Sequence, residues 1–313
     1  MLMMLRSLLD RLNIEDYDDG VDVLSDAIAA MRTGRPLSNR AQADSPWCYS
    51  LDAYEGAGFH VLLRGSGWVI PAEGAPIAMA AGDVALLPYG SAHLLSTTEI
   101  PRRPIPLEQA TASPNGDTDF LCGKYRFDHT RTHPVLAQLP EVVHVPAQLG
   151  RHPELRAAID LLAAEANAER SGRDAVISGL LDLLLVYIVR AWLDEHAHEG
   201  WPAALHDREI SAALTALHSD PAAPWRIEDL AAQVGLSRAT LARRFTALTG
   251  QPPMAYLTWW RMTTAGRLLR QTDLSLPGIA REVGYGSPFA FSHAFKRHFG
   301  RTPGRYRAEA VSE

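Results

Sequence analysis

The stretch "IAREVGYGSPFAFSHAFKRHFGRTPGRY", residues 279–306, repeats the pattern of the earlier stretch "LAAQVGLSRATLARRFTALTGQPPMAY", residues 230–256. Each contains a Val-Gly pair, a serine and two large apolar residues four positions apart, and each ends in Gly-x-x-Pro-x-x-Tyr. A glycine between two amphipathic segments is typical of the turn between two helices. The chain is therefore predicted to carry two helix-turn-helix units in succession.

The second helix of each predicted unit has an inner and an outer face. Apolar residues four positions apart, such as Phe291 and Phe295, are expected to face the core. The outer residues are candidates for contacts with DNA bases: Ala239, Ala242, Arg243 and Thr246, then Phe289, Ser292, His293 and Lys296. Arg243 is the strongest candidate because a guanidinium group can form two hydrogen bonds with guanine. Six arginines are expected to neutralise phosphates instead: Arg238, Arg244, Arg297, Arg301, Arg305 and Arg307.

The charge distribution indicates where a nucleic acid would bind. From Trp225 to the end the chain has 13 Lys and Arg against six acidic residues, a formal charge of +7, whereas the first 224 residues sum to −13 and the whole chain to −6. A basic module joined to an acidic one favours double-stranded promoter DNA as the partner of the C-terminal part only. A helical bundle with solvated arginines is the alternative.

The stretch "MAYLTWWRMTTAGRLLRQTD", residues 254–273, links the two predicted units. Its pattern predicts one helix of about 17 residues, roughly 26 Å long. A helix of this length would hold the two units near the ~34 Å that separates successive major-groove faces on one side of DNA.

The N-terminal part alternates short apolar runs with Gly, Pro and Asn/Asp turns from Trp47 to about Val145, which favours a small β-sandwich or barrel. Within "GDVALLPYGSAH", residues 82–93, the spacing of Gly, Pro, Gly and His93 resembles the second cupin motif, with Thr97 where that motif ends in Asn. In the degraded first motif, Gly58 stands at the position of the glutamate ligand, with Asp52 and Tyr54 near the positions of the paired histidines.

His60 lies two residues after Gly58 and is expected on the same side of its strand. Together with His93 and Cys122 it forms a candidate site for zinc or another transition metal, which needs at least three converging ligands. The alternative is that the histidines form hydrogen bonds within the barrel or to a small ligand. Three other histidines are expected at the surface or in turns: His129, His133 and His144.

Residues 151–195 predict two helices around a Ser-Gly break. An apolar stripe on the second helix is wide enough to cover the barrel and also to pair with a second copy of the chain: Leu180, Leu184, Tyr187, Ile188 and Trp192. A homodimer is expected, and packing within one chain is the alternative. The stretch "DEHAHEGWPAALHD", residues 194–207, is then predicted to be a linker.

Residues 207–308, with "IEDLAAQVGLSRATLARRF" and "IAREVGYGSPFAFSHAFKRHFGRTPGRYR", resemble the DNA-binding domain of AraC/XylS-type transcriptional regulators. The resemblance implies an all-α domain that places one helix-turn-helix unit in each of two consecutive major grooves. The first reading face departs from better-studied members by its two alanines, which can still pack against thymine methyl groups.

The N-terminal half, with "FHVLLRG", "GDVALLPYGSAH" and "CGKYRF", resembles the cupin-type sensor domain of the subgroup that includes reactive-chlorine-responsive regulators. This resemblance implies that cysteine oxidation is a trigger. Cys122 stands at the matching "CG" position, whereas Cys48 does not lie clearly at the place of a partner cysteine. Both are candidate redox residues, and a buried inert thiol is the alternative.

The predicted fold is α+β and multidomain: a cupin-like β-barrel over 20–147, a helical hairpin over 148–200 and an all-α domain with two helix-turn-helix units over 207–308. No signal peptide or membrane span is expected, so the protein is placed in the cytoplasm. The predicted function is a DNA-binding regulator that senses a small molecule, metal or oxidant, with RNA polymerase as a further partner. The alternative, a metal-dependent cupin enzyme tethered to DNA, lacks the histidine pair and glutamate, and no catalytic residue is assigned.

Overall fold

The computed structural model describes residues 22–31, 36–101, 103–111, 113, 115–127, 133–147, 151–166 and 170–311. Their contacts divide into two compact units. Of the described residues, a β-rich unit comprises those within Ala27–Asp207 and Phe245–Gln251, and a helical unit comprises Asp22–Asp26, Arg208–Arg244 and those from Pro252 on. The predicted α+β, multidomain class is confirmed.

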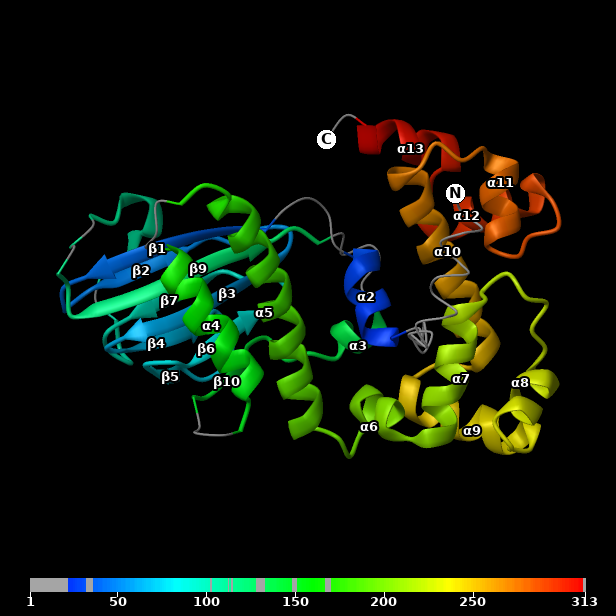
Figure 1. Cartoon of the computed structure of the whole chain (residues 1–313), viewed down its shortest axis with the longest axis horizontal. Coiled ribbons are helices and arrows are strands. Elements are labelled where there is room, and N and C mark those ends of the chain that lie inside the picture. The colour runs from blue at the N-terminus through cyan, green and yellow to red at the C-terminus, as the bar shows by residue number, and fades with distance from the viewer. Residues whose placement is uncertain are drawn as a thin grey trace, which may run out of the picture. The chain divides into compact units, whose positions relative to one another are not determined.

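Two five-stranded sheets form the β-rich unit (Figure 1), in the orders β1-β9-β3-β6-β10 and β5-β4-β7-β2-β8. The pairs are antiparallel apart from β2 with β8. The strands are β1 (Leu37–Ala43), β2 (Cys48–Leu51), β3 (Ala57–Arg64), β4 (Ser66–Pro71), β5 (Ile77–Ala80), β6 (Val84–Leu87), β7 (His93–Ser96), β8 (Ile105–Pro106), β9 (Thr118–Tyr125) and β10 (Val143–Val145).

The turns at both ends of β6 need glycine. Gly82 has φ +95°, and Gly90, which precedes β7, has φ +61°. A Cβ on Gly90 would lie 2.3 Å from the carbonyl oxygen of Tyr54 and 2.8 Å from that of Gly56. Only a residue without a side chain lets these backbone segments approach so closely while φ is positive. The glycine therefore fixes where β7, and with it His93, begins.

The predicted pair of helices around the Ser-Gly break is confirmed as α4 (Pro153–Ala166) and α5 (Arg173–Glu195). Gly172 takes a left-handed conformation immediately before α5. The Tyr125 hydroxyl donates a hydrogen bond of 2.6 Å to the carbonyl of Leu181, which holds α5 across one sheet (Figure 1). By length and composition α5 is the one helix among the described residues that is able to span a membrane, but half of its most apolar window is buried inside the fold.

The segment predicted as a linker is in part a helix. Three short helical segments complete the β-rich unit: η1 (Leu107–Gln109), α3 (Pro134–Ala137) and α6 (Gly200–His206). Trp201 of α6 is fully buried, and its ring meets the edge of His133 at 5.0 Å between centroids. The linker prediction is wrong here because burial of a tryptophan outweighs the polar composition around it.

His133 and His144 also differ from their predicted surface or turn positions. His133 is fully buried and accepts a hydrogen bond at the start of α3 from the Val135 amide. His144 is half-buried in β10, and its Nε2 lies 3.1 Å from the Asp83 carboxylate. His129 lies outside the described residues.

The helical unit contains the two predicted helix-turn-helix motifs, α8 with α9 and α11 with α12. Ser237 and Ser287 accept amide hydrogen bonds of 3.2 Å at the starts of α9 and α12, as a capping serine should. The linking helix α10 has 19 residues, about 28 Å. The helices are α2 (Val23–Met31, whose first residues belong to this unit), α7 (Arg208–Ser219), α8 (Ile227–Gln233), α9 (Arg238–Thr249, whose residues from Phe245 on are grouped with the β-rich unit), α10 (Pro253–Gln271), α11 (Leu276–Glu282), α12 (Pro288–Phe299) and α13 (Pro303–Val311).

The turn glycines of the two motifs should differ in their tolerance of substitution. Gly235 and Gly284 have φ +73° and +75°, so Gly→Ala is expected to cost about 1–2 kcal/mol at either. A Cβ on Gly284 would also lie 2.8 Å from the Ala222 carbonyl oxygen, whereas one on Gly235 meets nothing within 4 Å. Urea unfolding should therefore show a larger loss for Gly284→Ala than for Gly235→Ala, and equal losses would contradict this packing.

Candidate nucleic-acid interface and buried pocket

The outer face of α9 is exposed as predicted from its spacing. Ala239 and Arg243 are exposed and Ala242 and Thr246 are half-buried, while Leu241 on the opposite side is fully buried. The face therefore has one long cationic side chain between small ones. Such a surface allows the helix backbone to approach the base edges closely while one guanidinium group reaches them.

The outer face of α12 has larger side chains. Phe289, near the N-terminal end of the helix, is 86% exposed although it is apolar, while Phe291 and Phe295 on the inner side are fully buried. His293 and Lys296 are exposed next to the half-buried Ser292. An exposed phenylalanine where a recognition helix meets DNA can pack against thymine methyl groups.

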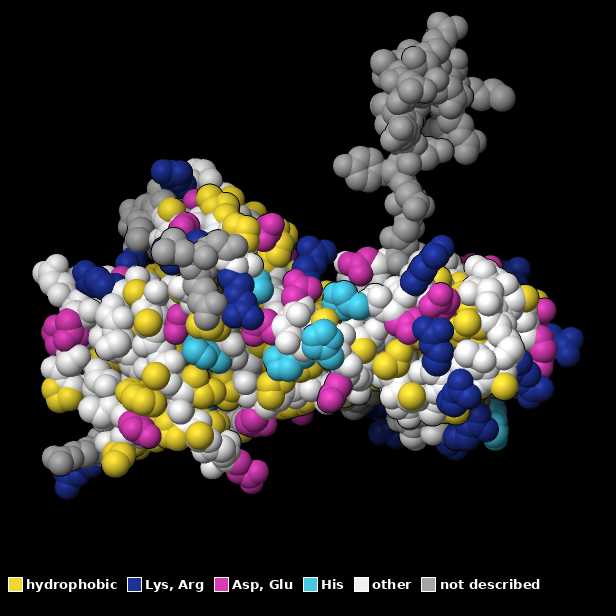
Figure 2. All heavy atoms as spheres, turned by 90° about the horizontal axis from the view of Figure 1, so that it is seen from below, with side chains coloured by type: hydrophobic (Ala, Val, Ile, Leu, Met, Phe, Trp, Pro, Cys, Tyr) yellow, Lys and Arg dark blue, Asp and Glu magenta, His cyan; other side chains and the backbone are white. Residues whose placement is uncertain are grey.

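Most of the predicted phosphate contacts have partners within the helical unit. Arg238 pairs with Glu228 at 3.2 Å and Arg244 with Glu209 at 3.1 Å, and both Arg301 and Arg305 pair with Glu309. Arg307 donates to the carbonyls of Leu269 and Leu274, so it also fixes the end of α10. Arg297 is exposed on α12. Figure 2 shows Lys and Arg side chains gathered on this unit, at its right.

The pocket in the β-rich unit unites the three residues that were proposed from sequence. His60 on β3 and Cys122 on β9 are directly paired across neighbouring strands. His93 begins β7 in the other sheet. All three are buried, with exposed fractions of 3%, 7% and 4% for His60, Cys122 and His93. The two sheets are therefore bridged by polar groups at this point of an otherwise apolar core.

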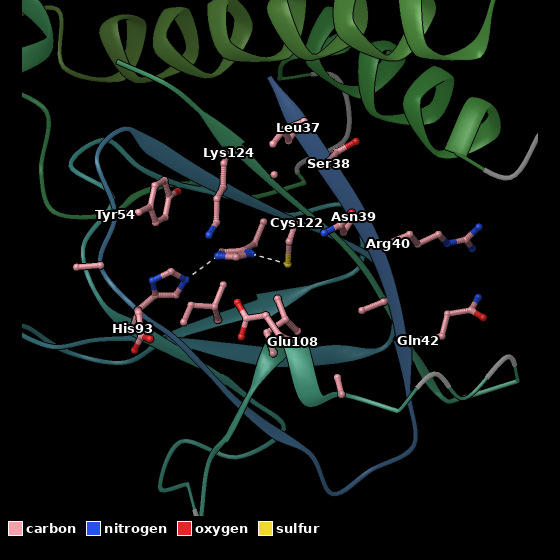
Figure 3. Close-up of a pocket in the computed structure, with 18 of the residues that line it drawn as sticks. Leu37, Ser38, Asn39, Arg40, Gln42, Tyr54, His93, Glu108, Cys122 and Lys124 are labelled. Atoms are coloured by element: carbon pink, nitrogen blue, oxygen red, sulfur yellow. Dashed lines mark hydrogen bonds between the residues drawn. The ribbon is translucent and has the colours of Figure 1, made fainter. Parts of the chain in front are cut away.

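The three side chains form a chain of hydrogen bonds, called here the relay (Figure 3). His60 Nδ1 lies 2.8 Å from Cys122 Sγ, His60 Nε2 lies 2.7 Å from His93 Nε2, and His93 Nδ1 lies 2.7 Å from the Ser91 carbonyl. A carbonyl oxygen only accepts, so His93 Nδ1 carries a proton and its Nε2 accepts from His60. His60 Nδ1 is then the acceptor for the Cys122 thiol. When all groups are neutral, each hydrogen bond of the relay therefore donates in the same sense, from Cys122 to His60, from His60 to His93 and from His93 to the Ser91 carbonyl.

Burial keeps the relay uncharged. Desolvation is the largest cause that lowers the pKa of His60 well below its usual range, and nearby His93 and Lys124 lower it further. Desolvation likewise lowers the pKa of His93 and raises the pKa of the Cys122 thiol, although the Lys124 charge opposes the latter effect. The thiol is therefore protonated and both imidazoles are neutral near pH 7.

This arrangement differs from the convergence that a metal site needs. The His60 ring lies between Cys122 and His93, with Nδ1 next to the sulfur of Cys122 and Nε2 next to His93. The three side chains therefore do not point at one common position. Among the described residues no group of three or more His, Cys, Asp or Glu is suited to hold a metal ion. A Cβ on Gly58 would lie 2.2 Å from the Tyr54 hydroxyl, so this phenol fills the space next to the position of the missing glutamate.

The cavity beside the relay measures about 450 Å³. Lys124, two residues after Cys122 on β9, extends into it with Nζ 4.3 Å from the centroid of the Tyr54 ring (Figure 3). The prediction missed Lys124, although the spacing within "CGKY" places it on the same strand face as Cys122. The rest of the lining mixes apolar side chains, among them Leu51 and Leu107, with polar and charged ones, among them Arg40, Asp52 and Glu108.

Cys48 is separate from this pocket. It is buried on β2 between Trp47 and Tyr49, which both pack in the core with Cys122, so the alternation of the strand turns Cys48 to the other face. Both cysteines are free thiols. The two predicted redox candidates thus lie in different surroundings.

Acid should weaken the β-rich unit through the relay histidines. The unfolded chain binds protons at a pKa near 6.5, whereas burial depresses the folded pKa of His60 and His93, so their contribution to stability is present above about pH 6.5 and is lost as pH falls. The urea midpoint of this unit should therefore drop between pH 7.5 and 5.5. His60→Gln should show a smaller drop, and an identical one would contradict the assignment.

Known proteins share both halves of this architecture. The Cupin family matches residues 22–194, more than half of the chain, and the Helix-turn-helix domain family matches residues 230–309. An AraC-like transcription regulator of Streptomyces lividans is 33% identical over 301 residues, spanning 92% of this chain and 98% of that protein. The RCS-specific HTH-type transcriptional activator RclR of Escherichia coli is 31% identical over 254 residues, spanning 80% and 83%.

Among solved structures, the DNA-binding domain of AdpA in complex with a target DNA is 35% identical and covers 34% of this chain and 95% of that chain, with a TM-score of 0.32. The Streptomyces relative aligns over nearly its whole length, and the family matches fall on the β-rich and helical parts in turn. The chain therefore belongs to the AraC-like DNA-binding transcription regulators that carry a cupin domain ahead of their helix-turn-helix units.

Proposed function

We propose that this protein is a cytoplasmic regulator that reads specific promoter DNA with the outer faces of α9 and α12 and changes this binding when a small molecule enters the pocket beside the relay. The observation that carries the proposal is the pair of exposed reading faces in a basic unit, each backed by fully buried residues such as Leu241 and Phe291. Contact with RNA polymerase is expected to follow from promoter binding.

The pocket supports the sensing part of the proposal. Its volume of about 450 Å³ is in the range of small-molecule sites, and its lining combines apolar side chains with polar and charged ones. We favour binding over catalysis as its role. Among the residues that the structure describes, the neutral relay and the phenol of Tyr54, next to the position of the cupin glutamate, leave no open set of metal ligands for oxygen chemistry.

The first test is binding of the purified protein to its own upstream DNA. Arg243→Ala is expected to weaken specific binding by about 1–3 kcal/mol and to relax preference at one base pair, because it removes a bidentate contact. Arg238→Ala, on the same helix, should weaken binding to all sequences alike. An equal loss on specific and random DNA for Arg243→Ala would show that Arg243 contacts only phosphate.

The predicted apolar stripe is largely used within the chain, because Leu180, Leu184, Ile188 and Trp192 are buried, but other residues of the α4–α5 hairpin support a homodimer. Three large apolar side chains are exposed on it, Leu161 at 59%, Val176 at 47% and Leu183 at 48%. A second copy that covers them would bury apolar surface at about 25 cal/mol per Å². Leu183→Glu should therefore shift the protein to a monomer in sedimentation analysis, whereas Ile100→Glu, exposed on a loop, should not. A dimer unchanged by Leu183→Glu would place the interface elsewhere.

A further inference from the structure

The relay and Lys124 together form a site suited to one class of reagent. We propose that Cys122 forms a covalent adduct with α,β-unsaturated carbonyl compounds that enter the pocket. This names a class of effector and rests on the sensing function proposed above. Three residues that line one cavity supply the needed groups: Cys122 is the nucleophile, His60 is the base, and Lys124 is the cation next to the carbonyl oxygen of the reagent.

The base is already in place. The Cys122 thiol points its proton at His60 Nδ1, 2.8 Å away, because the Ser91 carbonyl fixes the direction of the whole relay. The hydrogen bond of 2.7 Å from His60 Nε2 to His93 holds the imidazole ring in position. When His60 takes the thiol proton, its Nε2–H continues to donate to His93, so the ring keeps its orientation.

Burial selects for addition over reactions that begin from a free thiolate. Desolvation raises the pKa of Cys122, so little thiolate is present before a reagent arrives. In an addition the proton can move to His60 as the carbon–sulfur bond forms. Cys122 should therefore react slowly with simple alkylating agents. It should still react with a compound that fits the cavity and whose carbonyl group can be polarised by a hydrogen bond.

Lys124 supplies that polarisation. It lies two residues from Cys122 on the same face of β9, and its ammonium group points into the cavity towards the relay (Figure 3). A carbonyl oxygen that accepts from the Lys124 ammonium group would gain negative charge as the thiol adds. The carbon skeleton would lie against the apolar part of the lining.

The reaction balances without a further reagent. The Sγ–H bond breaks and its proton passes to His60 Nδ1, while sulfur bonds to the β-carbon and the C=C π bond opens. The electron pair moves to the carbonyl oxygen beside Lys124 as an enolate. Protonation of the α-carbon by His60 returns the imidazole to its neutral form, so the net change is the addition of S–H across C=C.

The test uses the full-length protein and 2-cyclohexen-1-one, followed by intact mass and peptide mapping. We expect an adduct at Cys122 that forms faster than any adduct at Cys48, which is also buried but lacks the relay. No adduct should form with the saturated ketone cyclohexanone. In guanidinium the two cysteines should react alike, because the site is gone. Equal reaction of both cysteines in the folded protein, or no adduct at Cys122, would overturn the proposal.

Two variants test the assigned roles. His60→Asn, which keeps a polar group but is no base, should slow the adduct about 100-fold, and Lys124→Met should also slow it, while Cys48→Ser should not. Unchanged rates in the first two variants would overturn the mechanism, provided that circular dichroism shows them folded. DNA binding by the adduct is measured separately. An adduct that leaves operator affinity unchanged counts against the sensing function, not against the modification site.

Discussion

Phe295→Ala should unfold the helical unit under mild denaturant while Phe289→Ala, the same substitution on the same helix, should not. Phe295 is fully buried, and its ring packs against Phe291, Phe299 and Tyr306 at centroid distances of 5.6, 4.5 and 5.2 Å. Truncation of a phenylalanine in such a cluster costs about 3–5 kcal/mol. That is a large share of the stability of a small domain.

The matched variant separates folding from recognition. Phe289 is 86% exposed, so Phe289→Ala should change the free energy of unfolding by less than about 0.5 kcal/mol. It should nevertheless weaken binding to operators that contain thymine at the contacted step, and replacing that thymine by uracil should abolish the difference between wild type and variant. Urea unfolding and DNA binding of both variants check this. Similar stabilities of the two variants would contradict the packing of α12.

Trp201→Ala is expected to have the second large effect, on the β-rich unit. Trp201 is fully buried, its ring meets His133, and its amide donates a hydrogen bond of 3.0 Å to the side chain of Gln138. Loss of the indole should cost about 3–5 kcal/mol, which corresponds to roughly 10 °C in melting temperature for a unit of this size.

Trp225 provides the control for this prediction. It is half-buried in the helical unit, and its indole donates to the Asp220 carbonyl, so Trp225→Ala should lower the melting temperature of the β-rich unit little. Calorimetry of the full chain distinguishes the transitions of the two units. If Trp201→Ala melts like the wild type, the segment after α5 does not belong to the core of this unit.

The helical unit could be predicted almost entirely from sequence because its signals are local. A glycine turn, a capping serine and phenylalanines four residues apart, as at Phe291 and Phe295, each act within one or two helical turns. The residues of the reading faces follow from the same spacing, because the residues that are not on the buried side of a helix form its exposed side. What could not be predicted is that an arginine such as Arg307 donates hydrogen bonds to distant backbone carbonyls, because those contacts depend on the tertiary structure.

The pocket could be predicted only in outline. The cupin-like spacing singled out His93, but the pairing of His60 with Cys122 joins residues 62 positions apart and depends on strand order. The direction of the relay depends on the Ser91 carbonyl, which no side-chain pattern reveals. Likewise, the helix around Trp201 was missed because its stability comes from burial against α3 and not from its own composition.

The unlike reading faces of α9 and α12 have a consequence for promoter architecture. The two motifs repeat one framework, yet one presents Arg243 between small side chains and the other presents Phe289 and Lys296. A site for one copy of the chain should therefore be two dissimilar half-sites read in a fixed order, and it has a polarity. Inverting such a site relative to the start of transcription would exchange which motif lies upstream, so orientation, and not only presence, should decide its effect on a gene.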